Sequence, residues 1–165
     1  MVQIAEKKPL TVGVEEAVGR GVAPPPMVFG AGLLLGLLLH LRWPLSFFPR
    51  RPARPIGSVL ALSGLALLTA SVEAMRRAGT TPDPDEPTRV LVETGPYRFS
   101  RNPIYLGMAL TYAGVATFAN ALWPLLLLPA LLRSVGEMVE REEHYLTRRF
   151  GGEYRVYRAR VRRWL

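Results

Sequence analysis

Apolar residues along the chain are gathered into four runs that polar segments separate. The first run, MVFGAGLLLGLLLHL extended by RWPLSFF, covers 27–48. The second, PIGSVLALSGLALLTASVEAM, covers 55–75 and has one acidic residue among its 21 positions. A helix needs about 20 mainly apolar residues to cross the hydrocarbon core of a bilayer. Both runs therefore predict membrane-spanning helices.

The third and fourth runs, IYLGMALTYAGVATFAN and ALWPLLLLPALLRSVGEM, meet at Asn120, and each is somewhat short for a full crossing. They predict two antiparallel helices joined by a tight turn, either tilted or ending before the far surface. Gly107 and Gly114 are seven residues apart, so they share one face of the third helix, where small residues allow close packing. A soluble bundle is the weaker interpretation, because the first two runs have no polar face.

The tail, EMVEREEHYLTRRFGGEYRVYRARVRRWL, has apolar and aromatic residues every three or four positions from Leu146 to Trp164. This spacing predicts one face of a helix, with arginines on its other faces and a bend at Gly151 and Gly152. For the arginine-rich part, 155–163, we expect an amphipathic helix lying on anionic lipid.

These patterns together predict an all-α integral membrane protein, with a bundle of about four transmembrane helices and a C-terminal amphipathic helical tail. A length of 165 residues suits a single domain. Its expected parts are an N-terminal arm (1–26), two spans (27–75), a cytoplasmic loop (76–101), a helical hairpin (102–138) and a tail that covers a cofactor (139–165).

Composition and charge agree with a membrane protein. Apolar residues make up 49% of the chain, and its formal net charge is +8. A basic soluble protein would suggest nucleic acid as a partner, whereas a basic and very apolar chain favours a bilayer with anionic headgroups and no nucleic acid. Seventeen lysines and arginines fall in the arm, the 76–101 loop and the chain from Arg133 onward, against four, Arg42, Arg50, Arg51 and Arg54, on the opposite side. The positive-inside rule therefore predicts cytoplasmic termini.

The stretch GPYRFSRNPIYLG, at 95–107, stands directly before the third run. Asn102 followed by Pro103 predicts a helix start, with an N-cap residue and then proline at the first helical position. The N-terminus of a helix attracts anions, and Arg98 and Arg101 add two positive charges beside it. The stretch therefore suits a carboxylate or a phosphate at the membrane surface. The alternative is ordinary interfacial anchoring by arginine and tyrosine.

Two adjacent acids, Glu142 and Glu143, interrupt the basic tail. Half-buried carboxylates without partners are costly, so the pair needs either arginine partners or a cationic ligand. Glu140 and His144 lie one helical turn apart, but two ligands make a weak metal site, and we expect no metal. The absence of cysteine excludes disulfides, thiolate metal sites and cysteine nucleophiles.

LVETGPYRFSRNPIYLGMAL, followed by EREEHYLTRRFGGEYRVYRARVRRWL, resembles the superfamily of isoprenylcysteine carboxyl methyltransferases and phospholipid N-methyltransferases. Three elements carry the resemblance: R-N-P-x-Y-x-G at 101–107, E-E-x-x-L at 142–146 and F-G-x-x-Y at 150–154. The isoprenylcysteine enzymes usually carry histidine at the position of Asn102, which disfavours a prenylcysteine acceptor. The resemblance implies a multi-pass protein of a bacterial or archaeal cytoplasmic membrane. Its active site would face the cytoplasm.

The resemblance implies that S-adenosylmethionine donates a methyl group to a lipophilic acceptor: a phospholipid amine, a prenylcysteine-like carboxylate or another small molecule. Arg98 or Arg101 would bind the cofactor's carboxylate, and one of the two glutamates its amino group or a ribose hydroxyl. The implied cofactor-binding residues are Tyr97, Arg98, Arg101, Asn102, Tyr105, Gly107, Glu142 and Glu143.

Three of these residues, Arg101, Glu143 and Tyr105, are the implied catalytic residues. The ring of Tyr105 would lie near the sulfonium, and Gly107 would leave room for the cofactor. An amine acceptor must lose a proton, which Glu143, His144 or Tyr97 would take.

Two other functions remain open at this point. One is an NADPH-dependent membrane reductase of the sterol-reductase kind, whose helical layout is similar. The other is a non-catalytic lipid-binding membrane protein. A soluble-type methyltransferase is disfavoured, because the chain has no strand with the glycine-rich turn of a Rossmann fold.

Overall fold

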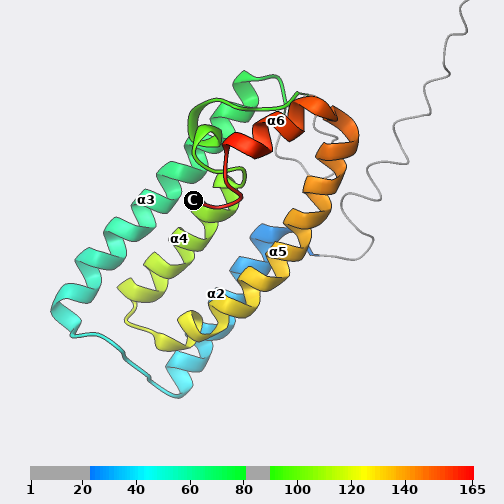
Figure 1. Cartoon of the computed structure of the whole chain (residues 1–165). Helices are drawn as coiled ribbons and strands as arrows, with labels where there is room; N and C mark the ends of the chain where they lie inside the picture. The colour runs from blue at the N-terminus through cyan, green and yellow to red at the C-terminus, as the bar shows by residue number, and fades with distance from the viewer. Residues whose placement is uncertain (1–22, 81–89) are drawn as a thin grey trace, which may run out of the picture.

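The computed structural model describes residues 23–80 and 90–165, and helices are the regular secondary structure within these ranges (Figure 1). Most of the expected N-terminal arm and the middle of the 76–101 loop lie outside the described residues. The all-α prediction is confirmed for the described part of the chain. Its elements are α2 (Pro25–Arg42), α3 (Arg50–Arg77), η1 (Gly95–Arg98), α4 (Pro103–Phe118), α5 (Leu122–Phe150) and α6 (Gly152–Arg160).

Three helices are long and apolar enough to cross a membrane: α2, the Arg51–Arg77 part of α3, and α5. The fourth apolar helix, α4, has 16 residues, which at 1.5 Å per residue is about 24 Å, shorter than a typical hydrocarbon core. A bundle of about four spans is thus consistent with the structure, with α4 as the short member.

Two expectations about helix ends were wrong. The first helix ends at Arg42 and does not continue to Phe48, because Pro44 cannot donate the next helical hydrogen bond. The fourth helix is not short, since α5 has 29 residues and runs through the predicted boundary at 138 without a break. The paired glutamates therefore lie on the same helix as the fourth apolar run. The predicted bend is present: Gly151, with φ 53°, separates α5 from α6.

The hairpin between α4 and α5 turns at Asn120, as predicted, and Asn120 is the non-glycine residue with positive φ among those described. Its side chain also joins this turn to the loop after α2. The Asn120 Oδ1 accepts a hydrogen bond from the backbone N–H of Phe48 at 3.1 Å, and its Nδ2 donates to the Phe48 carbonyl at 2.8 Å. Asparagine tolerates the left-handed conformation better than most residues, so one residue both turns the chain and fixes a neighbouring loop.

Helices α3 and α4 pack closely through glycines. A methyl group added to Gly107 would lie 2.9 Å from the Gly64 carbonyl oxygen, and one added to Gly114 would meet the backbone of Ala61. In the opposite direction, a methyl group on Gly64 would meet the backbone of Thr111. The prediction that Gly107 and Gly114 allow close helix approach is confirmed.

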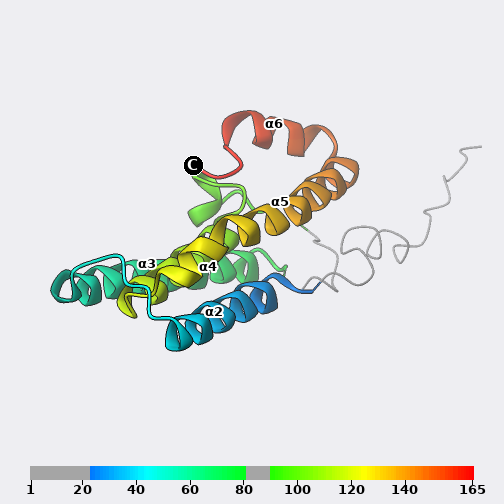
Figure 2. The ribbon, with the colours of Figure 1, turned by 90° about the horizontal axis from the view of Figure 1, so that it is seen from below.

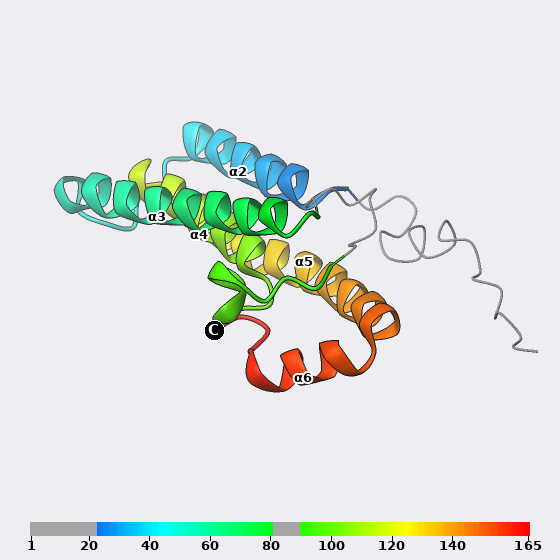
Figure 3. The same ribbon diagram turned by 90° about the horizontal axis from the view of Figure 1, so that it is seen from above.

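The buried core joins α2, α4 and α5. Phe29 contacts Tyr112 edge-on, with ring centroids 6.0 Å apart, and Val135 and Val139 complete the cluster. Trp164, near the end of the sequence, packs against the same cluster. Figures 2 and 3 show that α2 lies on one side of the bundle and α6 with the C-terminal segment on the other. The core therefore reaches from α2 to Trp164.

We expect Gly64→Ala to destabilise the protein by about 2 kcal/mol, because the added methyl group cannot be accommodated against a helix backbone without displacing it. Gly30→Ala is the matched control, since nothing lies within 4 Å of the position its methyl group would take. Its effect should stay within about 1 kcal/mol. Unfolding by sodium dodecyl sulfate in mixed micelles measures both. Equal losses in the two variants would contradict the close α3–α4 packing.

Candidate functional site

The site is built around the segment that precedes α4, which contains η1 and residues 99–102. Helix α4 begins at Pro103, as predicted, and Asn102 occupies the N-cap position. The side chain of Asn102 does not cap the helix, however. Its Nδ2 instead donates to the main-chain carbonyl of Arg163 at 3.0 Å. The predicted helix start is therefore right, and the predicted capping role of Asn102 is wrong.

Residues 161–165, the closing segment, lie against this stretch. The backbone N–H of Arg101 donates to the Arg162 carbonyl at 3.0 Å, and the Ser100 hydroxyl donates to the Arg163 carbonyl at 3.2 Å. Together with the bond from Asn102, they tie two segments about sixty residues apart. Sequence reasoning missed this pairing, because no periodic pattern connects the two segments.

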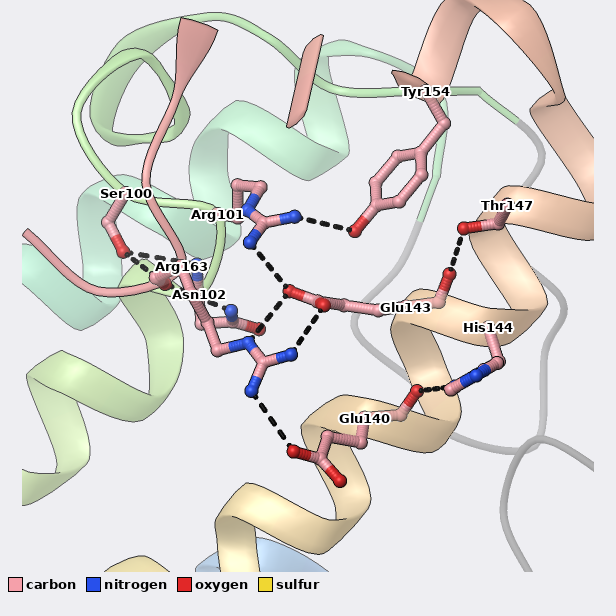
Figure 4. Close-up of polar contacts among 9 residues, drawn as sticks. All are labelled: Ser100, Arg101, Asn102, Glu140, Glu143, His144, Thr147, Tyr154 and Arg163. Carbon is pink, nitrogen blue, oxygen red and sulfur yellow. Dashed lines mark hydrogen bonds and ion pairs between the residues drawn. The ribbon is translucent and has the colours of Figure 1, made fainter. Parts of the chain in front are cut away.

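The Glu143 carboxylate lies between two guanidinium groups (Figure 4). Its Oε1 is 3.1 Å from Arg101 Nη2, and its Oε2 is 2.9 Å from Arg163 Nη2. The side chains of Arg101 and Glu143 are only 8% and 6% exposed. Hydrogen bonding to Glu143 raises the pKa of Arg163. The paired acids were expected to need either arginine partners or a cationic ligand. For Glu143, the structure provides arginine partners.

One guanidinium nitrogen of Arg101 lacks a partner among the described residues. Its Nη1 lies 3.5 Å from the Tyr154 hydroxyl, and its Nη2 binds Glu143. Its Nε is buried and has no hydrogen-bond partner among the described residues. A buried unsatisfied donor costs about 1–3 kcal/mol. An acceptor placed at this nitrogen would remove that cost.

Glu142 faces a second cluster, made of tyrosines. The Tyr105 hydroxyl donates to Glu142 Oε2 at 3.3 Å. Burial, and next the Glu142 charge, raise the pKa of Tyr97, so Tyr97 keeps its proton at neutral pH. The Tyr157 hydroxyl donates to the Tyr97 carbonyl at 2.8 Å and so fixes η1 against α6. The structure thus groups Tyr97, Tyr105 and Glu142 apart from the arginines that hold Glu143.

Three other predicted residues lie elsewhere. Arg98 is exposed and does not join the Arg101–Glu143 pair. Gly107 does not leave room for a cofactor, because α3 packs directly against it. Glycine is required at this position by the packing of the two helices. His144 is exposed, and its Nδ1 lies 2.7 Å from the Glu140 carbonyl oxygen (Figure 4). The Glu140 carboxylate, meanwhile, is bound to Arg163 at 3.2 Å.

The fold and the site define a helical membrane protein with a buried polar cluster at one end of its spans. Residues 53–153 match the family model described as phospholipid methyltransferase. The match covers more than half of the chain, so the protein belongs to the phospholipid methyltransferase family. This confirms the superfamily that the sequence elements indicated and makes the protein a membrane methyltransferase of the phospholipid or prenylcysteine kind. No curated protein and no solved structure matches the chain significantly.

We expect the two adjacent glutamates to differ in their effect on stability. Glu143→Gln breaks a buried ion pair and should destabilise the protein by about 3 kcal/mol, with a clear fall in the temperature of unfolding in detergent. Glu142→Gln keeps a hydrogen-bond acceptor for Tyr105 and should change the stability little. The exposed control, Glu137→Gln, should also change the stability little. Equal effects of Glu142→Gln and Glu143→Gln would mean that the arginine cluster is not the stabilising element.

Proposed function

We propose that the protein transfers a methyl group from S-adenosylmethionine to a lipophilic acceptor at the membrane surface. Family membership supports methyl transfer, and family members generally use this cofactor. The single observation that supports a ligand in this place is the buried Arg101 Nε just before α4, which has no partner in the described part of the chain. A carboxylate, which the cofactor carries, is a strong acceptor for such a donor.

The residues present fit the cofactor in a more specific way than the sequence suggested. Both Glu143 oxygens are bound by arginines, so Glu143 positions Arg101 instead of contacting a ligand. Glu142 has one hydrogen bond, from Tyr105, and is the better partner for an amino group or a ribose hydroxyl. Arg101 remains the carboxylate-binding residue, and exposed Arg98 contributes only long-range positive charge.

When bound, the cofactor supplies an electrophilic methyl group on a sulfonium. The protein's own contribution is then placement and exclusion of water. Tyr105 presents a ring and a hydroxyl, and the latter is held by Glu142. For an amine acceptor, Glu142 is the candidate proton acceptor. Tyr97 is unsuitable because its raised pKa keeps its hydroxyl protonated, and His144 lies outside the cluster. A carboxylate acceptor needs no base.

A phospholipid amine is the acceptor that we favour. The family is described by phospholipid methylation, and Asn102 stands where the prenylcysteine enzymes usually have histidine. The Asn102 amide is moreover bound to the closing segment at 3.0 Å, so it serves the structure of the site instead of the acceptor. We infer that the acceptor reaches the site laterally from the bilayer, while the cofactor enters from water.

Binding of S-adenosylhomocysteine to detergent-purified protein tests the cofactor assignment. We expect Glu142→Gln to weaken binding by about 1.5–3 kcal/mol, the scale of a hydrogen bond to a charged group. The control Glu137→Gln should bind like the natural protein. Binding of NADPH in place of S-adenosylhomocysteine would instead support a reductase, and binding of neither would support a non-catalytic lipid-binding protein.

Sidedness is proposed from the distribution of arginines, with the site and α6 in the cytoplasm. Because the chain has no cysteine, single cysteines can be labelled cleanly. An impermeant thiol reagent applied to intact cells should label Ser46→Cys, in the loop after α2, and should label Ala159→Cys, on α6, only after the cells are broken. Both positions are exposed. The reverse pattern would invert the topology without affecting the cofactor assignment.

A further inference from the structure

Two large apolar side chains are strongly exposed beside the site. Phe99 is 74% exposed and Leu165 is 78% exposed. The hydrogen bonds from Arg101 to the Arg162 carbonyl and from Ser100 to the Arg163 carbonyl align the two segments. Phe99 and Leu165 each lie within two residues of these bonded positions, so both belong to the edge where the two segments meet. Exposed apolar groups that gather in one place usually mark an interaction site.

Basic side chains are exposed on the same side of the bundle. Helix α6 buries Tyr154 and Tyr157 and exposes its other faces, including Val156 at 59%. Figures 2 and 3 place α6 and the closing segment together, on the side of the bundle away from α2. The exposed arginines of η1, α6 and the closing segment are Arg98, Arg155, Arg158, Arg160 and Arg162, of which Arg160 is paired with Glu93 at 2.6 Å.

The bilayer itself is the partner within reach. Helix α4 begins at Pro103, four residues after Phe99, so a membrane that encloses the apolar helices has its surface near this edge. Apolar side chains beside arginines match the boundary between acyl chains and anionic headgroups. An acidic soluble protein would match the arginines, but it would not need apolar groups at the depth where the spans begin.

We propose that Phe99 and Leu165, with the arginines Arg98, Arg155, Arg158 and Arg162, form an anionic-lipid-binding surface. The apolar pair enters the acyl boundary, and the arginines bind phosphate-bearing headgroups of negative charge. Arg163 and Trp164 lie between Arg162 and Leu165 in the chain, and they hold Glu143 and the core. Lipid contact at Arg162 and Leu165 would therefore also stabilise the polar cluster that Arg163 joins. This surface does not depend on which reaction the site performs.

The test uses the full-length protein with a single cysteine, Phe99→Cys or Leu165→Cys, carrying an environment-sensitive fluorophore. Each labelled variant is reconstituted into nanodiscs of neutral phosphatidylcholine or of a mixture with phosphatidylglycerol. We expect the emission to shift to shorter wavelength in the anionic discs. Quenching by spin-labelled acyl chains should also increase there, while quenching by an aqueous ion should decrease.

The arginines are tested in the Leu165→Cys background. Arg155→Gln with Arg158→Gln should abolish the difference between anionic and neutral discs. The matched control, Arg42→Gln with Arg51→Gln, removes the same charge at the other end of the bundle and should retain the difference. Labels that stay open to the aqueous quencher in both kinds of disc would overturn the proposal. Labels shielded from both quenchers only in discs that hold two copies would assign the surface to a second copy of the chain instead.

Discussion

The buried carboxylate of Glu143 is the constraint on which the end of this bundle depends. At 6% exposure, an uncompensated charge there would be very costly, so α5 must meet a cation at this point. Arg101 comes from the segment before α4 and Arg163 from the closing segment, so one carboxylate joins three separate parts of the chain. Replacing such clusters by apolar groups is often neutral in stability. The main effect of the Glu143 cluster is therefore to fix the positions of its two arginines.

Close packing of α3 against α4 fixes the position of α4, the helix that follows Arg101 directly in the chain. Because glycines on both helices remove side chains from their interface, the two backbones approach directly. Figure 1 shows that α3 and α5 both extend beyond the N-terminal end of the shorter α4. The segment before α4 and the closing segment occupy this end of the bundle. A larger residue at Gly107 would displace α4 and, with it, the helix start that carries Arg101.

Features that depend on local pattern could be predicted from the sequence, and features that depend on distant pairing could not. The apolar runs, the turn at Asn120 and the bend at Gly151 follow from hydropathy and from backbone preferences. The partner of Asn102 is a carbonyl 61 residues away, and a main-chain carbonyl carries no sequence signal. The length of α5 was also missed, because its charged second half looked like a separate tail, although charged residues continue a helix readily outside the apolar region.

Adjacent acids on a helix cannot serve one ligand equally, because consecutive residues point about 100° apart around the axis. The sequence alone left open which of Glu142 and Glu143 would contact a cofactor. The structure directs Glu143 to the arginines and Glu142 to Tyr105, with its charge also felt at Tyr97. We therefore propose that Glu143 is the structural acid of the pair and Glu142 the functional one. Arg101 connects the two roles, since Glu143 holds its Nη2 while its buried Nε has no acceptor among residues 23–80 and 90–165.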